Sequence, residues 1–389
     1  RRLALAAAAR ERRAQLRRVR AAINDASSLR FPFCVMPFRS FAAFGRLVPF
    51  EEARSESALV FCDTWDNAAS FAASHPLVFL SHQWLSYASP DPDNAHFEHM
   101  VRAVEALAAE RGFSPDQCHI WLDLHSIPQS NEATKALAIG AIALFAATTS
   151  HFVACAPETL HLDTGLLCSR DTYLSRGWCR LEQWAFMLAN GTDSIYFWGD
   201  ASGGLQRIDN VSSWIETSIK VFLGEFTKGE DKELLVDVVL GLYGLAFVSK
   251  LQRADGAAER GGGGAGMNCD ALWEQLQTHK AAIFPAELFG DLVELLETEL
   301  AEAMAQVSGD QDGERWPRRP QRRTEGKSSR VTGRPSPDKR ESFALFDRHG
   351  FDDVLRASGR LYKRACEARG RSTFHCPRGN PLLHSTMRV

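Results

Sequence analysis

The chain has 389 residues, of which 45% are hydrophobic and 24% charged, and this composition excludes a collagen-like or wholly disordered chain. Its formal net charge of −3 provides no general attraction to nucleic acids or anionic membranes, so we predict neither as a partner. The length predicts two or three structural units. Because the chain begins with Arg1 rather than Met, we expect a fragment or a processed product.

Cysteine usage favours a reducing compartment. The nine cysteines are scattered and form no C-x-x-C pair. They predict reduced, mostly buried thiols in a cytoplasmic protein rather than a disulfide framework. Near the C-terminus stand four residues of metal-ligating types: Cys366, His375, Cys376 and His384. Their spacing matches no zinc pattern, so we predict no metal site.

Residues 1–27 form the first predicted unit, a basic helix. Its Ala- and Arg-rich sequence places Leu16, Val19 and Ile23 on one helical face. Such an acid-poor helix is typical either of an organelle transit peptide or of an exposed helix that continues from an upstream region, and we favour the second. Residues 28–75, which are rich in Phe and Pro, predict an irregular apolar strap.

Residues 76–205 predict an α/β domain. Its expected strands are short apolar runs: "PLVFLSH" (76–82), "CHIWLDLHS" (118–126), "HFVACA" (151–156) and "SIYFW" (194–198). Helical patterns separate them near 95–112, 136–147 and 175–190, with Asp93 or Asn94 as the first N-cap and Gly112 as its C-terminal stop. This alternation predicts an open parallel sheet covered by helices on both faces. Residues 245–249, "LAFVS", are a candidate fifth strand.

The remainder of the chain carries little functional signal. Residues 206–307 predict helices with a Gly-rich linker near 255–266, residues 308–340 a disordered Arg- and Pro-rich linker, and residues 341–389 a short helical segment. The stretch "FDRHGFDD" lacks the ligand pattern of a calcium loop. The longest apolar run, 136–147, is too short to span a bilayer of about 30 Å, so we predict no transmembrane segment.

Polar and aromatic residues gather where the predicted strands end, which is where open α/β sheets bind ligands. The first strand ends in Ser81, His82 and Trp84, and the second in Asp123, His125 and Ser126. Trp178 and Glu182 lie one turn apart on the helix after the third strand. Together these groups suit a ligand with a planar ring and a sugar. No G-x-G-x-x-G follows the first predicted strand and no Walker lysine motif occurs, which disfavours a dehydrogenase or a P-loop NTPase.

Four motifs in order, "FLSHQW", "IWLDLHSIPQ", "HFVACAP" and "SRGWCRLEQW", resemble the Toll/interleukin-1 receptor (TIR) superfamily, and fungal heterokaryon-incompatibility domains look similar. The resemblance covers about residues 75–200 and implies a flavodoxin-like sheet of four to five strands in a signalling domain that self-associates. This chain departs from the family pattern at residues 82–84, "HQW", and in the long loop after the third strand. The last of the usual five strands is also not clear.

Enzymatic TIR domains cleave NAD between nicotinamide and ribose, so the resemblance implies NAD(P) as a substrate and no bound cofactor. By matching position, Glu182 corresponds to the catalytic glutamate and Trp178 to the aromatic that stacks on nicotinamide. We expect Ser81, His82 and Trp84 to form the pocket wall and residues 126–130 its lid.

Two other readings stay open. In a non-enzymatic adaptor or scaffold, homotypic partners bind the loop around Pro128, and Glu182 pairs with Arg176 or Arg180. In a nucleotide sensor, the pocket binds without cleavage. Asp123 either contacts the ligand or caps backbone N–H groups of its own loop.

Overall fold

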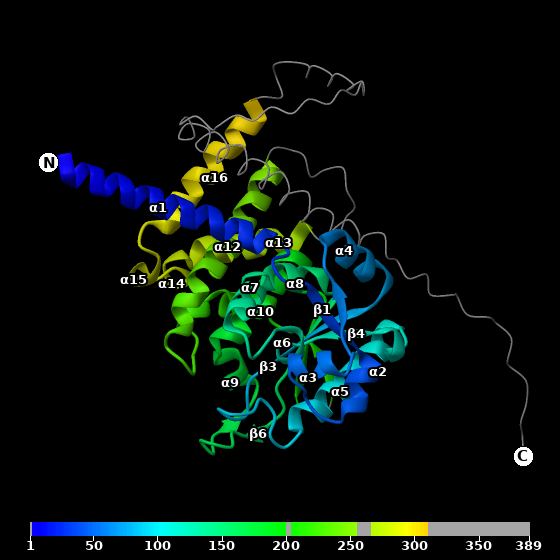
Figure 1. The fold of residues 1–389 in the computed structure, drawn as a ribbon. Coiled ribbons are helices and arrows are strands. Elements are labelled where there is room, and N and C mark those ends of the chain that lie inside the picture. Colours follow the sequence, from blue (N-terminus) through cyan, green and yellow to red (C-terminus); the bar gives the residue numbers. More distant parts are fainter. Residues whose placement is uncertain (1, 200–203, 255–265, 310–389) are drawn as a thin grey trace, which may run out of the picture. The chain divides into compact units, whose positions relative to one another are not determined.

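The computed structural model describes residues 2–199, 204–254 and 266–309 (Figure 1). They divide into two compact units. The sheet unit comprises residues 29–199, 204–229 and 266–283, and the helical unit comprises residues 2–28, 230–254 and 284–309. The linkers expected at 255–266 and 308–340 lie almost wholly outside the described residues, as do the C-terminal segment and its cysteines and histidines.

The sheet unit is a mixed α/β structure around one seven-stranded sheet. In spatial order its strands are β2 (Val60–Cys62), β1 (Phe33–Pro37), β4 (His119–Trp121), β3 (Leu77–His82), β5 (His151–Cys155), β8 (Ile195–Gly199) and β9 (Gly204–Arg207). The four central strands are parallel, and the pairs at both edges are antiparallel. A separate two-stranded hairpin contains β6 (Thr159–Leu160) and β7 (Leu167–Cys168).

The four parallel strands confirm the predicted positions, with one shortened. In β4 the strand stops at Trp121, and residues Asp123–Ser126 form the short helix α6 instead of continuing the strand. The predicted fifth strand is wrong, because residues 245–249 belong to helix α12 (Asp231–Ala254). A short apolar run is compatible with a buried helix as well as with a strand. Here the run is part of a much longer apolar segment, and that length favours a helix.

Residues 28–75 are regular and do not form the expected irregular strap. They contribute β1, β2 and three helices, α2 (Phe38–Phe44), α3 (Phe50–Ser55) and α4 (Trp65–Ser74). Strand β1 pairs antiparallel with β4 through Met36 and Ile120, and its residues 33–36 are fully buried. The continuous apolar run "FCVM" therefore extends the sheet.

Alternation along β3 directs its side chains to two different helical layers. Val78 and Leu80 join the core cluster that includes Met100 of α5 (Ala95–Arg111). Phe79 stacks on Phe152 of β5, which in turn contacts Phe186 of α10 (Gly177–Asn190). Helices α5 and α10 thus cover opposite faces of the sheet, which agrees with the predicted architecture.

The N-terminus of α5 is capped by Asp91 and not by the predicted Asp93 or Asn94. Asn94 occupies the N-cap site with a left-handed φ of 58° but makes no side-chain cap. The Asp91 carboxylate instead accepts hydrogen bonds from the amides of His96 (2.9 Å) and Phe97 (2.7 Å). Gly112 ends the helix in the left-handed region at φ 74°, as expected.

The other helices of the sheet unit differ from the predictions in number. The apolar run expected as one helix over 136–147 is divided at Ala141 into two. A further short helix precedes α10. These elements are α7 (Glu132–Gly140), α8 (Ile142–Thr148), α9 (Arg170–Ser175), α11 (Val211–Ile219), α13 (Gly266–Thr278) and α14 (Lys280–Ile283).

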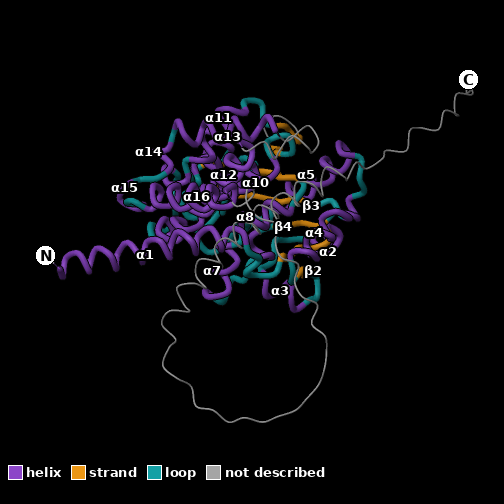
Figure 2. Tube along the Cα trace, turned by 90° about the horizontal axis from the view of Figure 1, so that it is seen from above, coloured by secondary structure: helices purple, strands orange, loops and turns teal. Residues whose placement is uncertain are grey.

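In the helical unit, three long helices contact one another pairwise: α1 (Arg2–Ser27), α12 and α16 (Leu292–Gly309) (Figure 2). The short helix α15 (Ala286–Phe289) contacts α12. Gly241 lets α1 approach closely, because a Cβ there would lie 2.5 Å from the Ala22 carbonyl oxygen. Within the described residues, α12 has one stretch, Asp231–Leu251, that is long and apolar enough to cross a membrane, and most of it is buried.

We predict that Gly177→Ala destabilises the sheet unit, since a Cβ at this first residue of α10 would lie 2.0 Å from the Phe226 ring. Overpacking of this kind costs about 1–3 kcal/mol. The free energy of unfolding from urea titration measures the loss. Gly140→Ala in α7 is the matched control, because its Cβ meets nothing within 4 Å and alanine favours the helix. Equal stability of the two variants would contradict the packing argument.

Candidate functional site

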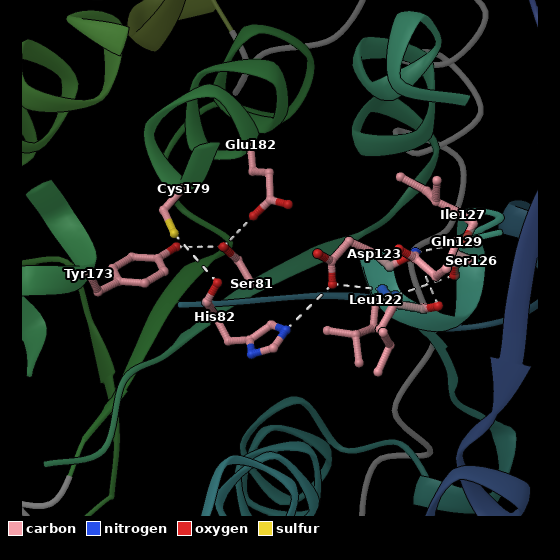
Figure 3. A network of polar contacts seen from close by, with 11 residues as sticks. Ser81, His82, Leu122, Asp123, Ser126, Ile127, Gln129, Tyr173, Cys179 and Glu182 are labelled. Atoms are coloured by element: carbon pink, nitrogen blue, oxygen red, sulfur yellow. Dashed lines mark hydrogen bonds and ion pairs between the residues drawn. The ribbon is translucent and has the colours of Figure 1, made fainter. Parts of the chain in front are cut away.

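The candidate site lies at the end of β3, which extends beyond the end of its neighbour β4. Phe79 pairs with Trp121, the last residue of β4, whereas Ser81 and His82 pair only with Ala154 and Cys155 of β5 on the other side. The chain beyond β4 turns into α6 at this point. The end of β3 therefore has a strand on one side and the start of α6, with Asp123, on the other (Figure 3).

Ser81 connects the sheet to α10 through a buried chain of hydrogen bonds. Its hydroxyl donates to Oε2 of Glu182 at 2.5 Å. The Tyr173 hydroxyl of α9 donates to Ser81 Oγ at 2.7 Å. All three residues are buried, and Glu182 is only 7% exposed. Figure 3 shows this Tyr173–Ser81–Glu182 chain as one continuous network.

Burial dominates the electrostatics of Glu182. Desolvation raises the pKa of its carboxyl group well above 4.5, the nearby Asp123 charge raises it further, and the Ser81 hydrogen bond opposes both effects. Burial also raises the pKa values of Tyr173 and of the Cys179 thiol well above their usual values, and the Glu182 charge adds to both. The protonated forms of all three groups are therefore favoured in this part of the site.

Asp123 lies on the more accessible side of the same site. Its Oδ1 accepts a hydrogen bond from the Leu124 amide at 2.7 Å and lies 3.4 Å from Nε2 of His82. Burial raises the pKa of Asp123, but interactions with His82 and the Leu124 N–H outweigh it and hold the pKa below its usual value. The side chain of Asp123 is 34% exposed, whereas that of His82 is 1% exposed.

His82 faces the opposite side of the sheet from Ser81. Its ring packs edge-on against His96 of α5, with ring centroids 5.1 Å apart. Burial lowers the pKa of His96 well below 6.5, and the neighbouring His82 lowers it further. The His82 ring therefore contacts the site through its Nε2, which lies next to the Asp123 carboxylate.

The loop after α6, expected as a lid, is fastened to α3. Oε1 of Glu51 accepts hydrogen bonds from the Gln129 amide (2.9 Å) and from the amide and hydroxyl of Ser130 (both 2.8 Å). Burial raises the pKa of Glu51, but these hydrogen bonds outweigh it and lower the pKa overall. Pro128 is buried. This loop is a packed part of the fold, and it does not present Pro128 as an exposed docking surface.

The structure brings together Ser81, His82, Asp123 and Glu182, but it turns His125 and Ser126 elsewhere. The His125 ring contacts Phe41 of α2, and its Nε2 lies 3.2 Å from the Ile120 carbonyl oxygen. Burial lowers the pKa of His125 to about 4. Ser126 accepts a 3.4 Å hydrogen bond from the Leu122 amide. Both residues stabilise the α6 turn rather than line the Ser81–Glu182 network.

The two tryptophans expected at the pocket are both partly exposed. Trp84 follows β3 and is 39% exposed, and Trp178 is half-buried one turn before Glu182 on α10. The predicted ion pairs of Glu182 with arginine are absent from the described residues. Arg180 donates to the carbonyl oxygens of Leu174 and Lys220, and Arg176 donates to Thr227 Oγ1.

Sequence reasoning missed Tyr173 and the polar contact of Cys179. The Cys179 thiol is buried, as expected for most cysteines of this chain, and it also donates to the His82 carbonyl oxygen at 3.5 Å. Tyr173 belongs to a loop-like stretch of sequence whose capping box, Ser169 with Thr172, was the available signal for α9. No group of three or more potential metal ligands occurs within the described ranges.

No family model, curated protein or solved structure matches the chain. Its function is therefore inferred from the site itself.

We predict that Glu182→Gln stabilises the protein at neutral pH. A carboxyl group whose folded pKa lies above its unfolded value of 4.5 costs stability as the pH rises through that interval, about 1.4 kcal/mol for each pH unit. The amide has no such cost and keeps hydrogen-bonding capacity toward Ser81. Urea unfolding of both proteins between pH 4 and pH 8 measures the difference, which grows with pH. A difference that does not change with pH would refute this account of Glu182.

Proposed function

We propose that this chain is a TIR-like cytoplasmic signalling protein whose sheet unit is an NAD(P) glycohydrolase. The parallel strands in chain order are β3, β4, β5 and β8, and their spatial order is 2-1-3-4, as in the first four strands of a flavodoxin-like sheet. In such sheets ligands bind beyond the carboxyl ends of the strands where the strand order reverses, here between β3 and β5. The observation that carries the proposal is that Glu182 meets Ser81 at this position.

The proposed reaction converts NAD⁺ and water to nicotinamide, ADP-ribose and a proton. The bond between ribose C1′ and the nicotinamide ring nitrogen breaks, and its electron pair stays with the departing nicotinamide. The resulting oxocarbenium-like sugar then gains the oxygen of water, which releases the proton. Carboxyl groups beside the ribose favour this path because they hold its hydroxyls and stabilise positive charge at C1′.

The residues of the site can be given roles in this reaction. Glu182 binds a ribose hydroxyl in place of its present partner, the Ser81 hydroxyl. Trp178 stacks on nicotinamide, as the resemblance implies. The substrate enters from the margin marked by Trp84 and Asp123, which are partly exposed, and no resident cofactor takes part.

A second candidate function is a non-enzymatic adaptor that binds another copy of this chain. The hairpin β6–β7 favours it, because it exposes four leucines, Leu160, Leu162, Leu166 and Leu167, each by 53–68%. The exposed Tyr87 adjoins them through its ring contact with His161. Apolar patches of a few hundred Å² mark interaction sites, and a symmetric contact that buries this patch twice approaches the size of a small specific interface.

We predict that the purified full chain at high concentration releases nicotinamide from NAD or NADP, and that Glu182→Ala lowers the rate by at least about 100-fold because the ribose loses its anchoring carboxyl. Chromatography of nicotinamide and ADP-ribose measures both products. The control is Asp116→Asn on the exposed surface, which retains the wild-type rate. A folded wild-type protein that releases no nicotinamide at any concentration would exclude the glycohydrolase and leave the adaptor.

For the adaptor function, we predict that self-association depends on the hairpin. Replacing Leu162 and Leu166 with serine removes exposed apolar surface and shifts the protein toward the monomer in light scattering. The control is Leu223→Ser, which removes an exposed leucine outside the hairpin and leaves the oligomeric state unchanged. A wild-type protein that is monomeric throughout the concentration series rules out this contact.

A further inference from the structure

The site contains two carboxyl groups with different surroundings. Glu182 is 7% exposed, and its hydrogen bond comes from the neutral hydroxyl of Ser81. The Asp123 side chain is 34% exposed and contacts the His82 ring and the Leu124 amide. In Figure 3 both carboxyl groups lie beside Ser81 at the end of β3. Because two negative charges so close together repel, their surroundings determine which one carries the charge.

We propose that Asp123 is the catalytic carboxylate that carries the negative charge in this site, that His82 positions it, and that Glu182 contributes an uncharged hydrogen-bonding group. This inference rests on the proposed NAD(P) glycohydrolase activity. It changes the residue that supplies the charge, since by position in the sequence that role belongs to Glu182.

Glu182 lacks what a buried anion requires. Among the described residues it has no cationic partner, because Arg176 and Arg180 donate to Thr227 and to backbone carbonyl oxygens. An unpaired charge buried in this way is costly, and the group takes up a proton instead. The Ser81 hydroxyl and the neutral carboxyl can still exchange hydrogen bonds. Glu182 is therefore suited to bind a ribose hydroxyl without a charge.

Asp123 has the partners that Glu182 lacks. It follows β4 at the first position of α6, where the Leu124 N–H donates to it. His82 Nε2 lies 3.4 Å from its Oδ1, and neither ring nitrogen of His82 has another hydrogen-bond partner among the described residues. The His96 ring packs against His82 and limits its movement. The imidazole thus holds the carboxylate at the accessible margin of the site.

Asp123 can act on both steps of the reaction. As the C1′–nicotinamide bond breaks and its electron pair leaves with nicotinamide, the Asp123 carboxylate stabilises the positive charge that develops on the sugar. When water adds to C1′, the carboxylate accepts the released proton. Its exposed side then returns that proton to solvent. The balance is NAD⁺ plus water to nicotinamide, ADP-ribose and a proton, with no other reactant.

The dependence of the rate on pH distinguishes the two carboxyl groups. Burial raises the pKa of Asp123, but His82, the Leu124 N–H and the charge interaction with His125 outweigh it and hold the pKa below its usual value, with Glu182 as the neighbouring carboxyl group. Glu182 faces Asp123, Tyr173 and Cys179, and burial raises its pKa well above 4.5. If Asp123 carries the charge, kcat stays within about twofold as the pH falls from 7.5 to 5. If ionised Glu182 carries it, kcat falls steadily over the same interval.

The test compares matched carboxyl-to-amide substitutions in the full chain, with nicotinamide release from saturating NAD as the readout. We expect Asp123→Asn to lower kcat by at least 100-fold, and Glu182→Gln to lower it by no more than tenfold because the amide keeps the hydrogen bonds. Asp116→Asn, which removes an exposed carboxylate paired with Arg39, is the control and keeps wild-type kcat. Urea unfolding checks that each variant is folded.

His82→Asn tests the positioning role separately. We expect the acidic limb of its kcat–pH profile to move to higher pH, because Asp123 loses the partner that favours its ionised form, while KM for NAD changes less than threefold. A merely structural role for His82 would lower the amount of active protein without moving this limb.

The possible failures are distinct. A folded Asp123→Asn protein with more than a third of wild-type kcat overturns the inference, as does a loss in Glu182→Gln that equals or exceeds that in Asp123→Asn. If Asp123→Asn does not fold, the wild-type profile decides, and a steady fall of kcat from pH 7.5 to 5 overturns the inference. A wild-type protein without nicotinamide release refutes the proposed function itself.

Discussion

The alternation of side chains at the end of β3 is the constraint on which the site depends. Ser81 and His82 are neighbours in sequence, yet the pleat of the strand sends Ser81 to Glu182 on α10 and His82 to His96 on α5. The end of this one strand thus contacts both helical layers, α10 through Ser81 and α5 through His82. Strand β4 stops three residues earlier in register than β3. The chain turns into α6 at this point, and Asp123 therefore lies beside His82 and near Glu182.

The polar network has a cost that the surrounding core offsets. Tyr173, Ser81 and Glu182 are buried, and each would be unfavourable there without a hydrogen-bond partner. The chain of hydrogen bonds satisfies these groups, and aromatic contacts such as Phe152–Phe186 fix α10 against the sheet. A fully satisfied network in a low-dielectric setting is rigid. In the proposed function, a ligand must therefore exchange these hydrogen bonds.

The sequence predicted the parallel strands and α10 because continuous apolar runs and helical spacing are local signals. It did not predict β1 and β2, since an apolar strap and a short strand cannot be distinguished by composition until a pairing partner is known. Asp123 and His125 both followed a predicted strand end, but the helical turn of α6 sends His125 toward Phe41. Tyr173 lies 92 residues from Ser81 in the chain, and no local pattern could reveal that contact. Likewise, which carboxyl group bears a charge depends on burial, which residue type does not encode.

The segment before the parallel strands is part of the architecture of the site. Glu51 of α3 holds the Gln129 and Ser130 amides, and the Gln129 side chain in turn donates to the carbonyl oxygens of Asp123 and Ile127. The end of α6 is thus fixed from a distant part of the chain. Since the position of Asp123 follows from that of α6, residues 28–75 help to position the carboxylate as well as to extend the sheet. The side chains of the site all come from residues 76–200, but their placement also depends on Glu51, which lies outside that range.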